Sequence, residues 1–78
     1  MFLEILSPEK SIFSGEIFSV KVPGEFGEFE ILKNHAPIIS SLKAGFVFII
    51  NRDMNKQKQE IKGGVIEVIS NKIIILVS

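Results

Sequence analysis

The sequence predicts an all-β protein, an antiparallel β-sandwich or flattened barrel of about eight to ten short strands. Three observations predict this class. Isoleucine, valine and phenylalanine dominate the apolar residues, whereas alanine, the best helix former, occurs only twice. Short apolar or alternating runs are separated by turn-forming residues along the whole chain. No segment has a convincing helical period, so no helix longer than one or two turns is expected.

The chain of 78 residues is expected to form one domain, residues 1–78. Turn residues divide it into expected strands, which are Phe2–Leu6, Ser11–Phe13, Glu16–Val22, Glu28–Leu32, Ile38–Leu42, Phe46–Ile50, Lys56–Lys62, Val65–Ile69 and Lys72–Val77. Ser14-Gly15 is expected to break the second of these from the third. Gly63-Gly64 is expected to bend or bulge the sheet, and Ser70-Asn71 to close a hairpin.

Alternation predicts which side chains of the third strand are buried. Phe18, Val20 and Val22 are expected on one face, and Ile17, Ser19 and Lys21 on the other. In the next strand, Phe29 and Ile31 are expected to lie opposite Glu28 and Glu30.

Two turns are predicted around the Glu28–Leu32 strand. Pro23-Gly24 is predicted to form a type II turn, with positive φ at the glycine. Residues 33–37 are predicted to form an ordered corner, because Asn34 tolerates left-handed geometry and Pro37 pushes Ala36 toward an extended conformation.

Two strands, Phe46–Ile50 and Lys72–Val77, are apolar on both faces. In a two-layer sandwich one face of each strand points outward, so this surplus surface must be covered. Either neighbouring parts of the chain cover it, or it is a permanent partner surface. The charged run Lys56–Lys62 is typical of an exposed edge strand.

Composition excludes several functions. The chain has no cysteine and one histidine, so neither a thiolate nor a histidine metal cluster is expected. Nine basic residues balance nine acidic ones, which argues against non-specific nucleic-acid binding. Early polar residues argue against a signal peptide, and no apolar run approaches the roughly 18 residues of a membrane span. These features predict a soluble intracellular or organelle-matrix protein.

Catalysis is not expected. His35 has no nucleophile partner beside it in the sequence, and a lone histidine at a proline corner is usually structural or an interface residue. Glu28 and Glu30 share a solvated strand face, which is commoner than an acid–base pair. Gly24 and Gly27 do not lead from a strand into a helix, so no phosphate cradle and no cofactor site is predicted.

The most specific pattern is the run from Val22 to Gly45, V-P-G-E-F-G-E-F-E-I-L-K-N-H-A-P-I-I-S-S-L-K-A-G. It resembles the signature of the epsilon subunit of F-type ATP synthases, V-x-G-x-x-G-E-x-x-x-x-x-x-H-A-P followed by L-K-x-G. The opening L-E-I-L-S-P-E with I-F-S-G is similar to the family's start. The ending G-G-V-I-E-V-I-S-N-K-I-I-I-L-V is similar to its G-G-x-x-E-V hairpin. The resemblance covers almost the whole chain in the family's order.

The resemblance implies a non-catalytic β-sandwich at the foot of the rotating central stalk. This domain would bind the gamma subunit and the polar loops of the c-subunit ring, and so couple ion translocation to ATP synthesis. Glu28 matches the family's acidic position facing the ring. Ser7, His35 and Ser40 match positions near gamma; otherwise each of these four residues is an ordinary turn or surface residue. The implied location is the cytoplasmic, matrix or stromal side of the energy-coupling membrane, with no homo-oligomer required.

The sequence departs from the family in one respect. Family members usually continue into a C-terminal helical hairpin, to which inhibition of hydrolysis and nucleotide sensing belong, whereas this sequence stops at Ser78 after its I-I-I-L-V run. The expectation is therefore that this chain neither binds ATP nor extends into the catalytic head.

Two other classes remain open. A biotinyl or lipoyl carrier is also a small β-sandwich, and residues 53–56 (D-M-N-K) could be its lysine-bearing turn, although carriers surround that lysine differently. A β-barrel that binds single-stranded nucleic acid would need exposed aromatic residues in a basic groove. Here the phenylalanines lie in core-like strands and the net charge is zero.

Overall fold

The computed structural model describes all 78 residues, and it confirms the all-β class with eight strands and no helix. The structure contains no helix that is long and apolar enough to cross a membrane. The strands are β1 Phe2–Leu6, β2 Ser11–Gly24, β3 Gly27–Ile31, β4 Ile38–Leu42, β5 Gly45–Asn51, β6 Lys56–Ile61, β7 Gly64–Ile69 and β8 Lys72–Val77.

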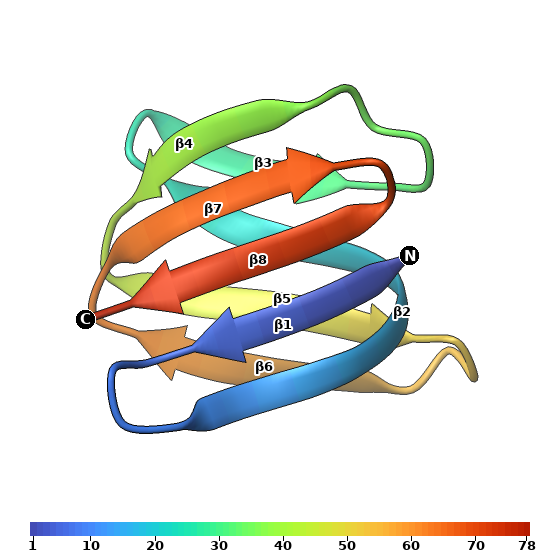
Figure 1. Ribbon diagram of the computed structural model, residues 1–78, viewed down its shortest axis with the longest axis horizontal. Helices are drawn as coiled ribbons and strands as arrows, with labels where there is room; N and C mark the ends of the chain where they lie inside the picture. Colours follow the sequence, from blue (N-terminus) through green and yellow to red (C-terminus); the bar gives the residue numbers. More distant parts are fainter.

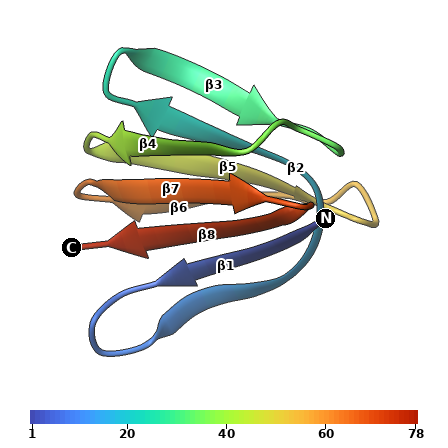
Figure 2. The ribbon, with the colours of Figure 1, turned by 45° about the horizontal axis from the view of Figure 1, so that its top comes forward.

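The strands form two layers that share one strand (Figures 1 and 2). In the front layer of Figure 1, β4, β7, β8 and β1 lie side by side, and the first half of β2 pairs with β1. In the back layer, the second half of β2 lies between β3 and β5, and β5 pairs with β6. The layers also meet at one bridge between Gly24 and Leu42. All pairs are antiparallel except β1 with β8.

The predicted break at Ser14-Gly15 is wrong, because β2 is continuous over 14 residues. Ser14 and Gly15 lie opposite Glu4 and Leu3 of β1, which supply a complete ladder partner. Serine and glycine favour turns by themselves, but here the backbone hydrogen bonds to β1 outweigh that local preference. The long β2 thereby connects the two layers.

The prediction of which β2 side chains are buried is also partly wrong. Phe18 is 51% exposed, whereas Ile17 and Ser19 are 3% and 2% exposed, the reverse of the expectation. The register with β5 shifts between Ile17 and Ser19, and such a bulge adds one residue and moves the following side chains to the other face. Val20 and Lys21 beyond the bulge lie buried and exposed, as predicted.

The core lies between the layers and consists of aliphatic side chains only. Its 14 buried residues are Leu3, Ile5, Ile17, Val20, Val22, Ile31, Leu42, Val47, Ile49, Ile61, Ile66, Val68, Ile73 and Ile75. Every strand contributes at least one of them. The charged strand β6 is an edge strand, as predicted, and its one apolar residue, Ile61, points into this core.

The turns were predicted with mixed success. Pro23 and Gly24 are buried residues of β2, so the predicted type II turn there is wrong; Gly27 pairs with Gly24 and adopts a φ of 136°. Asn34 has a φ of 66°, which confirms the left-handed corner. Ser70 and Asn71 have φ values of 49° and 61°, the positive pair that a tight type I′ hairpin requires.

Candidate interaction surface

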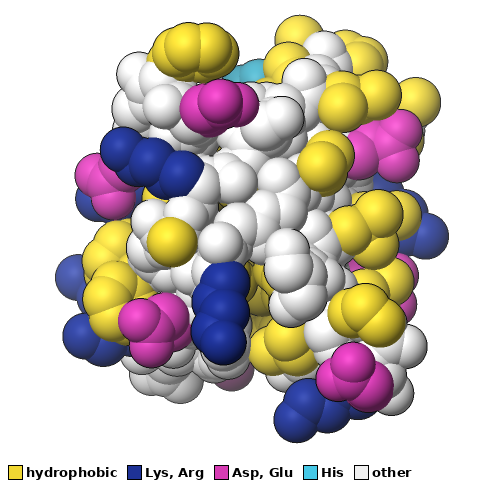
Figure 3. Space-filling model, turned by 90° about the vertical axis from the view of Figure 1, so that its left-hand side faces the viewer, with side chains coloured by type: hydrophobic (Ala, Val, Ile, Leu, Met, Phe, Trp, Pro, Cys, Tyr) yellow, Lys and Arg dark blue, Asp and Glu magenta, His cyan; other side chains and the backbone are white.

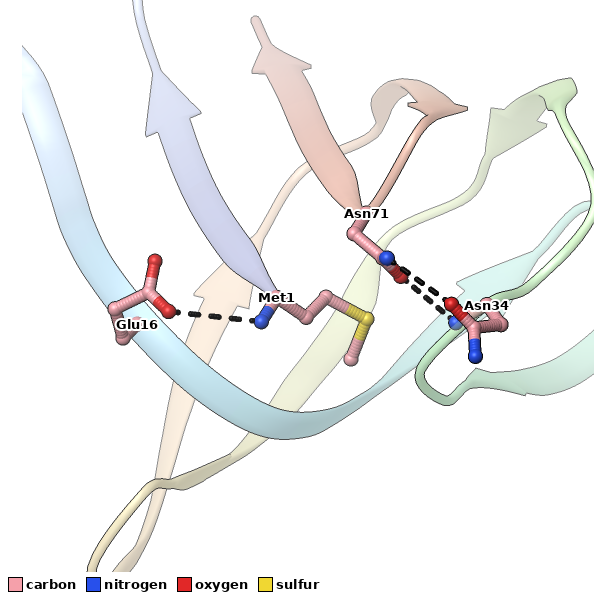
Figure 4. A network of polar contacts seen from close by, with 4 residues as sticks. All are labelled: Met1, Glu16, Asn34 and Asn71. Carbon is pink, nitrogen blue, oxygen red and sulfur yellow. Dashed lines mark hydrogen bonds and ion pairs between the residues drawn. The ribbon is translucent and has the colours of Figure 1, made fainter.

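Glu28 lies where the sequence predicted, on the outward face of β3. It is exposed, lies opposite Pro23 of β2, and is the second residue after the β2–β3 turn. Its carboxylate makes no ion pair, since the only salt bridge joins the Met1 amino group to Glu16 at 3.6 Å (Figure 4). Glu28 is therefore free to meet an external partner at the end of the sandwich that carries this turn.

Ser7, His35 and Ser40 are not brought together. β1 and β4 both run parallel to β8, so Ser7, which follows β1, and His35, which precedes β4, lie at opposite ends of the front layer. The hydroxyl of Ser7 donates to the Lys10 carbonyl at 3.2 Å and closes the β1–β2 turn. Ser40 is half-buried, and its hydroxyl donates to the Ser41 carbonyl at 3.3 Å. Ser7 and His35 lie at the ends of the front layer, whereas Ser40 lies opposite the buried Ile66, on the inner face of β4.

His35 lies in a corner held by a reciprocal pair of hydrogen bonds (Figure 4). The amide of Asn34 donates to Oδ1 of Asn71 at 2.7 Å, and Nδ2 of Asn71 donates to Oδ1 of Asn34 at 3.1 Å. The carbonyl of Asn71 also accepts from the amide of Phe2 at 2.9 Å. Asn71 thus joins the corner, the β7–β8 turn and the start of β1, and it fixes the backbone that presents His35.

The imidazole of His35 is oriented by its own neighbour. Nδ1 lies 2.7 Å from the Ala36 carbonyl oxygen, which can only accept, so Nδ1 is the donor of this hydrogen bond. The ring is half-buried and has no carboxylate or hydroxyl partner.

Replacing Asn71 with alanine is expected to lower the free energy of unfolding by about 2 kcal/mol, because two hydrogen bonds are lost and alanine is strained at positive φ. Asn71→Gly is the matched control: it loses the same hydrogen bonds without the strain, so it should lose only about 1 kcal/mol. Urea unfolding measures both values. Equal stability of Asn71→Ala and the wild type would contradict the role of this residue.

The outward face of β4, β7 and β8, which we call the front flank, carries exposed apolar side chains together with Glu67 and Lys72. Its exposed large apolar side chains are Ile39, Val65, Ile69 and Leu76. Ile39 is 73% exposed and lies opposite Glu67, and Leu76 lies opposite Val65. Hydrophobic side chains gather along the right-hand side of Figure 3, which is the front layer seen from its end. The sequence predicted that β8 is apolar on both faces, but it did not predict that Ile39, Val65 and Ile69 are exposed.

The second two-faced strand, β5, is partly shielded by lysine side chains, although Phe46 and Phe48 on its outer face each stay 38% exposed. The Lys58 ammonium lies 4.7 Å from the centroid of the Phe46 ring, and the Lys21 ammonium lies 5.3 Å from that of Phe48. Lysine side chains can shield apolar surface with their methylene stems while the charge stays in water. Both two-faced strands thus keep accessible apolar area, but on β5 it is bordered by lysine side chains.

The β5–β6 turn does not favour the carrier reading. Oδ1 of Asn51 accepts from the amides of Asp53 and Asn55 at 2.9 and 3.0 Å, which organises this turn around an asparagine. Lys56 lies in β6, opposite Ile50, and not at the hairpin tip.

Comparisons with known proteins agree over the whole chain. Residues 1–78 match the family model of the β-sandwich domain of the ATP synthase delta/epsilon chain. The ATP synthase epsilon chain of Chlorobium limicola is 45% identical over 74 residues, which cover 95% of this chain and 84% of that relative. The epsilon chain of Sulfurimonas denitrificans is 44% identical, and there the match covers 96% of this chain but 58% of the relative.

Solved structures show the same fold. A chain in the OSCP/F1/c-ring structure of the Euglena gracilis mitochondrial ATP synthase superposes with a TM-score of 0.90 at 19% identity, over 96% of this chain and 48% of that one. A chain in the central stalk/c-ring structure of the Tetrahymena thermophila mitochondrial ATP synthase superposes with a TM-score of 0.80 at 15% identity, over 97% of this chain and 61% of that one.

Proposed function

This chain belongs to the family of the ATP synthase delta/epsilon-chain β-sandwich domain, and from this premise we propose that it is a rotor subunit of an F-type ATP synthase. It is a structural or regulatory subunit and not the catalytic one. In this role it links the gamma subunit to the c-subunit ring, so that rotation driven by ion flow reaches the catalytic head. The carrier alternative is not favoured by the family or by the position of Lys56.

The front flank is the proposed docking surface for gamma. The supporting observation is that four large apolar side chains of this flank stay exposed on a chain of only 78 residues. They are Ile39, Val65, Ile69 and Leu76. Glu67 lies between Ile39 and Ile74 on this flank, so gamma would meet a carboxylate as well as the apolar side chains. Ser7, His35 and Ser40 are proposed as further contacts with gamma. With gamma on this flank, no self-association is required.

Glu28 is proposed to face the ring. It is an exposed carboxylate without an ion-pair partner, at the end of the sandwich opposite the His35 corner. We place the subunit on the cytoplasmic, matrix or stromal side of the membrane, where the polar loops of the ring would be within reach of this end.

Reversing the charge with Glu28→Lys is expected to weaken the ring contact by about tenfold, since it places a cation where the partner meets an anion. ATP-driven ion pumping in membrane vesicles should fall relative to ATP hydrolysis, while stability should change by less than about 0.5 kcal/mol on this solvated face.

Asp53→Lys is the matched control for this experiment. It reverses an exposed carboxylate in the β5–β6 turn, at the other end of the sandwich, and should leave the pumping-to-hydrolysis ratio unchanged. Equal pumping by the Glu28→Lys and Asp53→Lys enzymes would remove Glu28 from the ring contact.

A further inference from the structure

Phe26 is the most exposed large apolar residue in the chain. Its side chain is fully exposed, at 101% of the reference, whereas the next, Ile39, is 73% exposed. It lies in the two-residue turn between β2 and β3, next to Glu25, and forms no part of the core or of the front flank. The fold therefore gains nothing from a phenyl ring at this position, and an apolar ring in water is unfavourable.

The turn that carries Phe26 is held firmly. The β2–β3 ladder continues up to the Gly24–Gly27 pair, so only two residues lie outside it. The amide of Glu25 donates to the Ser41 carbonyl at 3.1 Å, and the amide of Lys43 donates to the Pro23 carbonyl at 2.9 Å. These bonds tie the β2 side of the turn to the end of β4. The backbone that carries Phe26 is therefore ordered before binding, which lowers the entropy cost of using this residue as an anchor.

Charged side chains surround the ring. Glu25 precedes Phe26, Glu28 follows two residues later, and Lys43 lies on the adjoining segment; all three are exposed. Acidic groups on both sides of the ring would be repelled by an anionic lipid surface. They match instead a protein surface in which an apolar recess is bordered by arginine or lysine.

We propose that Phe26 is the anchor residue of the ring contact, inserting into an apolar recess bordered by basic side chains in the polar loops of the c-subunit ring. This inference rests on the ring contact proposed above and adds to it an apolar centre, of which Glu28 is the charged margin. Aromatic residues that fill a pocket at the centre of an interface commonly supply much of its binding energy, and charges at the rim supply orientation and association rate.

The test uses the chain assembled with gamma and the c-subunit ring purified in detergent. Phe26→Ser is expected to weaken binding of this assembly to the ring by about thirtyfold. Phe26→Leu, which keeps an apolar side chain, should lose less. Met54→Asn is the matched control, because it removes an exposed apolar side chain from the β5–β6 turn and asparagine accepts the positive φ of that position. Binding to gamma and the melting temperature should be unchanged in all three variants.

The outcomes separate this inference from the proposed function. If Phe26→Ser binds the ring like the wild type while Glu28→Lys binds weakly, the anchor is overturned and the ring contact stands. If the wild-type assembly does not bind the ring, both are overturned. Loss of gamma binding in Phe26→Ser would assign the residue to the other interface. Wild-type binding to phosphatidylglycerol vesicles without the ring, lost in Phe26→Ser, would make Phe26 a lipid contact and also overturn the proposal.

Discussion

Gly64→Ala is expected to destabilise this protein more than any other single-methyl addition, by at least about 3 kcal/mol. Gly64 begins β7 and pairs with Val77 of β8 and with Leu42 of β4. A Cβ atom there would overlap the Leu76 carbonyl oxygen and lie 3.1 Å from the Val77 Cα. These are backbone atoms, so no rotamer change can relieve the overlap, and β7 must move away from β8.

The loss is a substantial share of the total free energy of unfolding, which for a chain of this length is roughly 4–12 kcal/mol. Thermal unfolding followed by circular dichroism measures the effect. Gly15→Ala is the matched control, because a Cβ at that strand position would meet only Phe13 side-chain atoms at 3.8 Å, an ordinary contact. Equal melting temperatures for the Gly64→Ala and Gly15→Ala proteins would contradict the prediction.

Leu76→Asp is expected to abolish the complex with gamma at micromolar concentration. Leu76 is 53% exposed and lies in the front flank opposite Val65 on β7 and Leu6 on β1. In the free protein a carboxylate at this position stays hydrated, so the fold should lose no more than about 1 kcal/mol. In the proposed interface the same carboxylate would be buried without a partner, which weakens binding by about a hundredfold or more.

Co-expression with gamma followed by gel filtration tests this expectation. The wild type should elute with gamma in one peak, and the Leu76→Asp protein should elute in two. Met54→Asp introduces the same charge at a similarly exposed residue, 55%, in the β5–β6 turn, and should leave the single peak unchanged. A single peak for Leu76→Asp would mean that gamma binds elsewhere on the sandwich.

The two-faced strands show how far composition alone reaches. The runs F-V-F-I-I and I-I-I-L-V predicted surplus apolar surface, but not whether the chain itself covers it. Cross-strand pairing decided what borders this surface, because the neighbours of Phe48 include Lys21 and Lys58, whereas those of Leu76 are Val65 and Leu6. Strand neighbours far apart in sequence cannot be read from a local pattern.

The sequence by itself determined the all-β class, the edge strand β6, the Ser70-Asn71 hairpin, the left-handed Asn34 and the family, because each depends on local residue preferences or on a motif. The tertiary structure alone decided the rest. Pairing with β1 keeps β2 continuous through Ser14-Gly15, and a bulge against β5 turns Phe18 outward and Ser19 inward. It also decided that the Asn34 corner is joined to Asn71, 37 residues away. The physical reason is that hydrogen-bond partners and register belong to pairs of strands, and a single strand's alternation does not contain them.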